Sequence, residues 1–330
     1  EVDLFKPAYG DREHPGVVRR LMEIARAQWR LSRALRSYDA LYVRVHPLAW
    51  WITVRARRAG VPVVQESNGS WHDAVAAWPS VGWATGLIVR LQVRQYRDAD
   101  AVIAVSETLA AWLERETGRT DVVVSPNGAN DRLFRPGLGR PARLPERYVI
   151  FFGQFAPWQR IEVLLAAIER PEWPHGVELV LAGDGALRPV VEEAAARDHR
   201  VHYLGTLPYA DLPPIVCNAV AATVLTYAPE RAGYSPLKLY ESMACGVPVI
   251  CSDTPGQAEY VRAAQAGIVV PPEDPVAVAD AAAELAADPE RARRMGARGR
   301  EAVEREYSWA ARSRQRREVV ERAIGLRPQG

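Results

Sequence analysis

The apolar positions of the chain follow two periods that alternate along its length. Short apolar runs, typical of buried parallel strands, precede longer segments in which apolar residues recur every three or four positions, as in helices. The runs lie at residues 39–44, 60–66, 100–106 and 122–124 in the first half, and at 148–153, 177–183, 201–204, 219–226 and 247–251 in the second. This order predicts an α/β protein with two Rossmann-like domains that face each other across a cleft.

A segment rich in proline and glycine, Phe134–Arg147, separates the two halves. Such segments are typical of linkers between domains. We therefore expect a first domain at residues 1–140 and a second at residues 146–306. A last helix at residues 307–330 is expected to pack back on the first domain.

The stretch Gly233–Ile250 carries the clearest candidate chemistry. Ser235 suits an N-cap and Pro236 the first helical position, so a helix is expected to begin there. Its unpaired N–H groups, with Lys238 one turn in, favour a phosphate. Glu241, on the same helix face, is able to accept from both hydroxyls of a ribose. The alternative is a capped helix whose Lys–Glu pair is only solvated.

A second candidate lies where residues 60–66 end in the loop Ser67-Asn68-Gly69. In an open α/β sheet, ligands bind at the carboxyl ends of the strands. His72 follows this loop and is the one histidine that we consider for the site, with a surface histidine as the equal alternative.

Composition places the chain among soluble globular proteins, with 48% apolar and 25% charged residues. The formal net charge is +2, but residues 1–145 hold 21 Lys and Arg against 15 Asp and Glu, and the remainder holds 21 against 25. The basic first half favours an acidic or membrane partner, or is simply a mixed solvated surface. Scattered arginines without an aromatic platform give no case for nucleic acid.

The first helix, expected at Gly16–Ser37, combines an apolar stripe with a basic face. The stripe comprises Val17, Leu21, Ile24, Ala25, Leu31 and Leu35, and the basic face Arg19, Arg20, Arg26, Arg30, Arg33 and Arg36 beside Trp29. Such a face suits peripheral contact with an anionic membrane, and a solvated arginine-rich face is the alternative. The cysteines Cys217, Cys245 and Cys251 are expected to be reduced core thiols. Together these features predict a cytoplasmic protein, extending to the inner membrane surface if the contact forms.

Several segments taken together carry a family resemblance over nearly the whole chain. In the first half these are residues 39–44, 63–69, 100–106 and 125–128; in the second they are residues 152–153, 179–185, 201–205 and above all 235–249. In this order and spacing the chain resembles the GT-B-fold retaining glycosyltransferases of the large family-four type (glycosyl transferases group 1), in a branch with a Ser-Pro-Leu-Lys helix start.

The resemblance implies a nucleotide-sugar donor of UDP or GDP type and a glycan, lipid or small-molecule acceptor. It implies transfer with retention of configuration and without a metal or other cofactor. Glu241 would bind the ribose, and Leu237 and Lys238 the diphosphate. The donor site would also include Gly153, Gln154, Gln159, Arg160, Leu207, Gly233, Tyr234, Ser235 and Pro236, and Asn68, Gly69 and His72 would face the transferred sugar and the acceptor.

Three departures from the family pattern accompany the resemblance. Gln154 and Gln159 stand where the family has cations, with Arg160 nearby, and Gly233 replaces a sugar-binding glutamate. The family's first strand and helix have no counterpart before Val2. Two rivals therefore stay open: a non-catalytic subunit that binds a nucleotide or glycan, and a GT-B-fold nucleotide-sugar epimerase.

Overall fold

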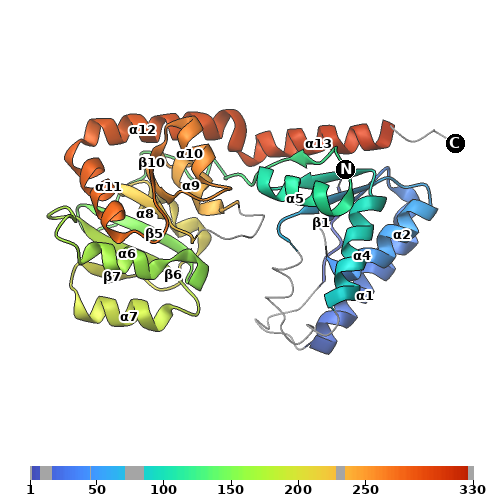
Figure 1. Ribbon diagram of the computed structural model, residues 1–330, viewed down its shortest axis with the longest axis horizontal. Coiled ribbons are helices and arrows are strands. Elements are labelled where there is room, and N and C mark those ends of the chain that lie inside the picture. The colour runs from blue at the N-terminus through green and yellow to red at the C-terminus, as the bar shows by residue number, and fades with distance from the viewer. Residues whose placement is uncertain (1, 8–16, 45, 71–84, 228–234, 326–330) are drawn as a thin grey trace. The chain divides into compact units, whose positions relative to one another are not determined.

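The computed structural model describes residues 2–7, 17–44, 46–70, 85–227 and 235–325. The chain divides into two compact units (Figure 1). Unit 1 comprises residues 1–125, 231–233 and 314–330, and unit 2 comprises residues 126–230 and 234–313. These limits follow from packing; the domain limits expected from the sequence stay predictions. Among the described residues no helix is long and apolar enough to cross a bilayer.

Unit 1 is built on a parallel sheet of order β1-β2-β3-β4. Its strands are β1 (Leu41–Arg44), β2 (Val63–Ser67), β3 (Ala101–Ala104) and β4 (Val123–Val124). The helices are α1 (Val17–Ala34), α2 (Trp50–Arg58), α4 (Thr85–Asp98) and α5 (Glu107–Thr117). Helix α13 (Trp309–Gly325) adds Val319 and Ala323 to a buried cluster with Val64 and Ile103 of the sheet.

Unit 2 is built on a six-stranded parallel sheet of order β10-β9-β8-β5-β6-β7. The strands are β5 (Tyr148–Gln154), β6 (Glu178–Asp184), β7 (Val201–Tyr203), β8 (Ala221–Val224), β9 (Val249–Ser252) and β10 (Gly267–Val270). The helices are α6 (Ile161–Ile168), α7 (Arg188–Arg197), α8 (Pro213–Val216), α9 (Leu237–Ala244), α10 (Ala258–Ala264), α11 (Pro275–Ala287) and α12 (Pro289–Ala302). Hydrophobic clusters fill both faces of this sheet, as expected where helices cover a parallel sheet on both sides.

The predicted fold class is confirmed, since each unit carries its own parallel sheet with helices. The expected apolar stripe of the first helix is only partly buried. Leu35 is buried and Leu31 packs against the core of unit 1, whereas Leu21 and Ala25 are exposed. Periodicity identifies the helix correctly, but it does not tell which turns of the stripe meet a partner.

Close packing between α12 and the end of α9 gives the first testable prediction. A Cβ atom added at Gly296 would lie 1.9 Å from the backbone oxygen of Gly246. We expect Gly296→Ala to destabilise the protein by about 1–3 kcal/mol, because backbone has to move to admit the methyl group. Thermal unfolding monitored by circular dichroism measures this as a lower Tm. Gly86→Ala in α4, where nothing lies within 4 Å, is the control and should cause no loss. Equal Tm values for the two variants would contradict the prediction.

Candidate nucleotide site

Lys238, in the first turn of α9, lies at the carboxyl end of β5. Its Nζ donates a hydrogen bond of 3.0 Å to Oε1 of Gln159 and lies 3.6 Å from the centre of the Phe151 ring. Burial lowers the pKa of Lys238 to about 7, and the nearby carboxylate of Glu241 opposes this shift. The ammonium therefore has neutral neighbours on two sides and is ready to bind an anion.

Two glycines shape the strand ends beside this lysine. Gly153 has φ +117°, a conformation that side chains rarely adopt, and a Cβ there would lie 3.5 Å from Cε of Lys238. Gly183, opposite it on β6, has φ +149°, and a Cβ would lie 1.8 Å from the Gly153 oxygen. The ends of β5 and β6 thus form a close backbone edge beside Lys238.

Glu241 lies one turn after Lys238 and is 5% exposed. Its Oε1 accepts a hydrogen bond of 2.7 Å from the hydroxyl of Tyr209. Burial raises the pKa of Glu241, while the hydrogen bond from Tyr209 and the charge of Lys238 act in the opposite direction. A carboxylate held by one hydrogen bond keeps acceptor capacity for the hydroxyls of a ligand.

Tyr209 is a site residue that the sequence did not indicate. It begins a short 3-10 turn, Tyr209–Asp211, two residues after Leu207, and its ring lies 5.2 Å from that of Phe134. Leu207 itself is half-buried against the hydrophobic cluster of unit 2. In the sequence, only its position two residues after Leu207, beside the expected nucleobase loop, could have indicated Tyr209.

The expected N-cap at Ser235 is wrong. Helix α9 begins at Leu237, its N-cap is Pro236 in an extended conformation, and no side chain caps it. The Ser235 hydroxyl instead accepts from the backbone N–H of Asn127 at 3.0 Å and shares a hydrogen bond with the Tyr240 hydroxyl. Ser235 therefore ties the start of α9 to the segment after β4.

The remaining donor-side residues differ in their surroundings. Gln154 is exposed at the end of β5, and Leu237 is 46% exposed. Arg160 adopts a left-handed conformation with φ +47° and forms an ion pair with Glu273. Its charge is therefore balanced by a carboxylate. Gly233 and Tyr234 lie outside the described residues.

In unit 1, Asn68 follows β2 and belongs to a polar cluster around Glu66. Asn68 Nδ2 donates to Glu66 Oε1 at 2.9 Å, Tyr42 donates to Glu66 Oε2, and Arg316 Nη1 lies 3.6 Å from that oxygen. The buried Oδ1 of Asn68 has no hydrogen-bond partner among the described residues. Burial and the Glu66 carboxylate raise the pKa of Tyr42. The sequence did not single out Glu66.

Gly69 and His72 were also expected on this side of the site. The carbonyl of Gly69 accepts a hydrogen bond of 3.1 Å from Ser67. His72 lies outside the described residues. Over the described part of the chain, no three His, Cys, Asp or Glu side chains gather as they do around a metal ion.

Family models match both halves of the chain. One described as "Glycosyl transferases group 1" matches residues 146–288, and one described as "Glycosyl transferase 4-like domain" matches residues 5–128. The chain belongs to the family-four type of GT-B glycosyltransferases. This confirms the family and the GT-B type expected from the sequence, while the retaining mechanism and the Ser-Pro-Leu-Lys branch stay predictions.

Relatives of this glycosyltransferase include mannosyltransferases of mycobacteria. A GDP-mannose-dependent alpha-(1-6)-phosphatidylinositol monomannoside mannosyltransferase of Mycobacterium tuberculosis is 28% identical over 85% of this chain and 75% of its own length. A phosphatidyl-myo-inositol mannosyltransferase of Mycobacterium leprae is 32% identical over 66% of this chain and 58% of its own.

Solved structures agree with the fold of this glycosyltransferase. A sucrose-phosphate synthase of Thermosynechococcus elongatus superposes with a TM-score of 0.76 at 23% identity, over 97% of this chain and 83% of that one. Anabaena HepE in complex with UDP superposes with a TM-score of 0.73 at 19% identity, over 92% of this chain and 84% of that one.

The contact between Tyr209 and Glu241 gives a pH-dependent prediction. A hydrogen bond to a carboxylate contributes about 1.5–3 kcal/mol, and one to a neutral group about 0.5–1.5 kcal/mol. Burial raises the Glu241 pKa above its ordinary value, so the carboxyl is protonated in acid and becomes the better acceptor as it loses its proton with rising pH. We therefore expect Tyr209→Phe to destabilise the protein more at pH 7 than at pH 4. Urea unfolding at both values measures the difference.

The matched control is the same substitution in a Glu241→Gln background, where the cost of Tyr209→Phe should not change with pH. If Tyr209→Phe in the otherwise wild-type protein lowers the free energy of unfolding equally at pH 4 and pH 7, Tyr209 has only a packing role.

Proposed function

We propose that this glycosyltransferase moves a sugar from a nucleotide-diphosphate donor to an acceptor hydroxyl with retention of configuration. The observation that carries the proposal is the pair Lys238 and Glu241. Both are buried, they lie one turn apart on α9, and Lys238 lies against the end of β5. A cation at a helix start and a carboxylate one turn deeper match the two polar parts of a nucleoside diphosphate.

In this proposal the diphosphate lies at the start of α9, where Lys238 and the backbone of Leu237 meet it. Glu241 accepts from the ribose hydroxyls, and Leu207 and Tyr209 lie beside the nucleobase. Ser235, Pro236, Gln159 and Gly153 position the lysine and the helix start. We propose uracil or guanine as the base, since a relative depends on GDP-mannose and the Anabaena structure holds UDP.

The reaction requires no side-chain nucleophile. The acceptor oxygen attacks the anomeric carbon on the face that the diphosphate leaves, the bond to the diphosphate oxygen breaks, and that oxygen takes the acceptor proton. Lys238 and the start of α9 stabilise the charge that grows on the leaving group. Neither a metal ion nor another cofactor is part of this proposal.

We propose a glycan, lipid or small-molecule acceptor, bound by the first domain at Asn68 and Gly69. The Oδ1 of Asn68 supports this, because it has no hydrogen-bond partner among the described residues and a buried carbonyl oxygen of this kind favours a hydroxyl donor. The relatives named for phosphatidylinositol substrates favour a lipid acceptor. We further propose a cytoplasmic location.

A non-catalytic binding subunit is the second candidate. It is favoured by the glutamines at positions 154 and 159 and by the ion pair that engages Arg160. Incubation with UDP- and GDP-sugars, followed by detection of released nucleoside diphosphate, separates the two. Slow donor hydrolysis without acceptor supports the transferase, whereas binding of donor without any turnover, with or without acceptor, supports the subunit.

Two variants test the proposed donor site. Glu241→Gln should weaken binding of both nucleoside and nucleoside diphosphate about 10- to 100-fold, the loss of one charge-assisted hydrogen bond. Lys238→Met should weaken binding of the diphosphate and leave the free nucleoside nearly unchanged. Calorimetric titration of each variant with uridine, guanosine and their diphosphates measures both effects.

The control for these variants is Glu178→Gln, since Glu178 pairs with His202 elsewhere on unit 2. It should bind both ligands as the wild type does. Unchanged binding in Glu241→Gln and Lys238→Met would mean that the start of α9 is a structural helix cap and not a nucleotide site.

The lowered pKa of Lys238 predicts that donor binding takes up a proton. With a pKa of about 7 the free lysine is mostly neutral at pH 8, and a bound diphosphate favours its charged form. Binding at pH 8 should therefore take up close to one proton, and affinity should fall as pH rises above 7. Titration calorimetry in buffers of different ionisation enthalpy measures the uptake. The Lys238→Met variant should bind the diphosphate without this proton uptake. Release of a proton by the wild type on binding would contradict the prediction.

A further inference from the structure

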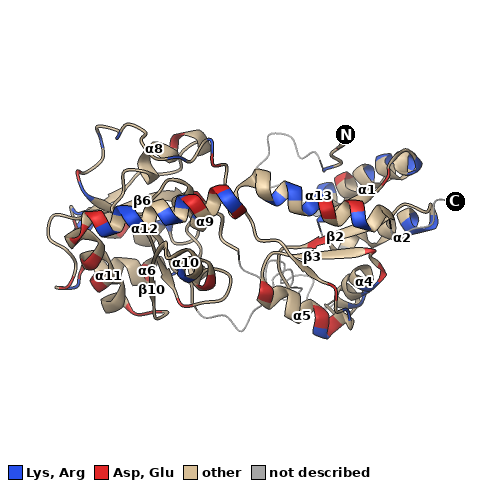
Figure 2. Cartoon of the chain, turned by 90° about the horizontal axis from the view of Figure 1, so that it is seen from above, with Lys and Arg blue, Asp and Glu red and all other residues tan. Residues whose placement is uncertain are grey.

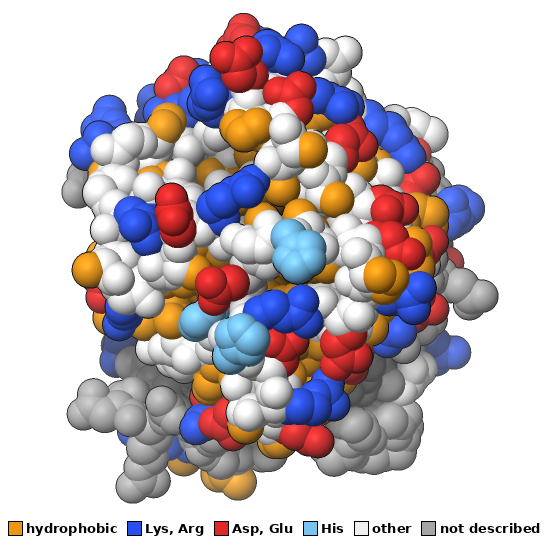
Figure 3. Space-filling model, turned by 90° about the vertical axis from the view of Figure 1, so that its left-hand side faces the viewer, with side chains coloured by type: hydrophobic (Ala, Val, Ile, Leu, Met, Phe, Trp, Pro, Cys, Tyr) orange, Lys and Arg blue, Asp and Glu red, His pale blue; other side chains and the backbone are white. Residues whose placement is uncertain are grey.

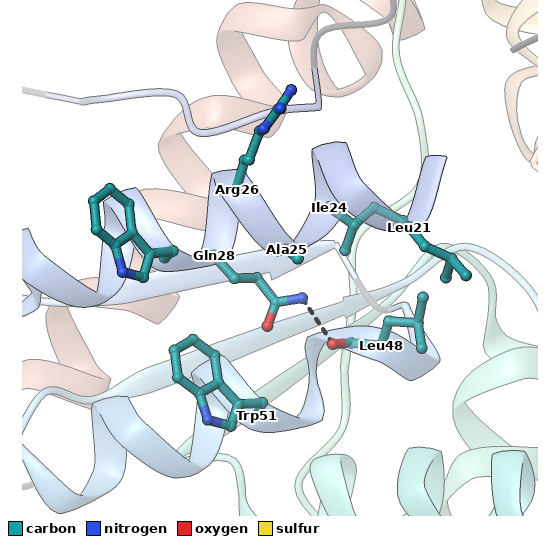
Figure 4. Close-up of a pocket in the computed structure, with 8 residues that line it drawn as sticks. Leu21, Ile24, Ala25, Arg26, Gln28, Leu48 and Trp51 are labelled. Atoms are coloured by element: carbon teal, nitrogen blue, oxygen red, sulfur yellow. Dashed lines mark hydrogen bonds between the residues drawn. The ribbon is translucent and has the colours of Figure 1, made fainter. Parts of the chain in front are cut away.

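An apolar pocket opens on the surface of unit 1 between α1 and α2. It has a volume of about 650 Å³, and its apolar lining comprises Leu21, Ile24, Ala25, Trp29, Leu48 and Trp51. Figure 4 shows Leu21, Ile24 and Leu48 directed toward one another, with the Gln28 amide bonded to the Leu48 carbonyl at 2.8 Å. The volume lies in the usual range of small-molecule pockets.

The side chains around this pocket are unusually exposed for their type. The exposed fractions are 53% for Trp29, 42% for Trp51, 48% for Leu21 and 41% for Leu48. Single exposed apolar residues are ordinary, but a contiguous group around a pocket marks an interaction site. Tryptophans of this kind favour a boundary between an apolar phase and water.

Arginines frame the same surface. The Arg33 guanidinium lies 4.1 Å from the Trp29 ring centre and that of Arg55 lies 5.3 Å from the Trp51 ring centre. Among the described residues, neither has an acidic side chain within ion-pair distance. Figure 2 shows basic residues along α1 and α2, whereas α1 holds a single acidic residue, Glu23, and α2 none.

One face of unit 2 differs from this surface. Figure 3 shows a face of unit 2 on which acidic and basic side chains are interspersed. On α12, for example, Arg291 and Arg294 each have a glutamate partner. At the pocket Arg26 pairs with Glu23, whereas Arg33 and Arg55 have no acidic partner among the described residues, so the basic charge beside the apolar lining is only partly balanced.

We propose that the α1–α2 surface docks the protein on an anionic phospholipid bilayer, with one acyl chain entering the pocket. Trp29 and Trp51 would lie at the level of the headgroups, and Arg33 and Arg55 would meet lipid phosphates. A second copy of the chain fits this surface poorly, because an isologous contact brings two basic faces together. The inference does not depend on the transfer reaction.

Sedimentation with vesicles, without donor or acceptor, tests the proposal. The protein should bind vesicles containing phosphatidylglycerol and not vesicles of phosphatidylcholine alone. The double variant Arg33→Gln, Arg55→Gln should lose binding on the order of 25-fold, since each arginine near an anionic surface contributes roughly fivefold. The matched control changes two exposed arginines of α12, Arg291 and Arg294, to glutamine and should bind as the wild type does.

A second variant tests the pocket separately from the charge. Ala25→Phe keeps every arginine, adds apolar area and fills the pocket, so we expect it to weaken vesicle binding at least tenfold. Equal or tighter binding by Ala25→Phe would overturn the acyl-chain site. Three results would overturn the docking surface. The first is an equal loss of binding in the α12 control, and the second is no binding to anionic vesicles at low salt. The third is a dimer, seen by light scattering, that the Ala25→Phe variant dissociates.

Discussion

The candidate site in unit 2 depends on a lysine and a glutamate buried one helical turn apart. Burial disfavours the charged form of each side chain, so it lowers the pKa of Lys238 and raises the pKa of Glu241. The charge of each side chain opposes the pKa shift of the other. Each also has one neutral partner, Gln159 for the lysine and Tyr209 for the glutamate. These partners hold both side chains in place without an opposite charge, so a ligand that carries both an anionic group and hydroxyl donors would gain from both.

The backbone beside Lys238 has glycines at two strand ends. Gly153 adopts φ +117°, which favours glycine, and the edge between β5 and β6 stays narrow because Gly183 has no side chain. The choice of lysine fits the same constraint. Lys238 is one of only two lysines in a chain with 42 basic residues. A compact ammonium is able to change its protonation state when it is buried, whereas a guanidinium keeps its charge and needs more room.

The sequence predicted what depends on local order along the chain. Strand and helix periods identified both sheets, and the spacing of Lys238 and Glu241 predicted their common helix face. What it missed are contacts between distant residues: Tyr209 with Glu241, 32 positions apart, Tyr42 with Glu66, 24 apart, and Lys238 with Gln159, 79 apart. Ser235 failed as a cap for the same reason, because its hydroxyl found a tertiary partner in the backbone of Asn127. The local sequence does not reveal whether a side chain bonds to its own helix or to a residue far away in the chain.

Cations next to aromatic rings occur in both units, and burial decides what each can do. Lys238 lies over Phe151 in the interior, where the loss of water lowers its pKa and prepares it for a ligand that restores the charge. Arg33 and Arg55 lie over Trp29 and Trp51 at the surface, where water sustains the guanidinium charge while the rings stay exposed. The first arrangement favours a small anionic ligand. The second presents charge and apolar area side by side over two helices, which suits an extended anionic surface better than any single small anion.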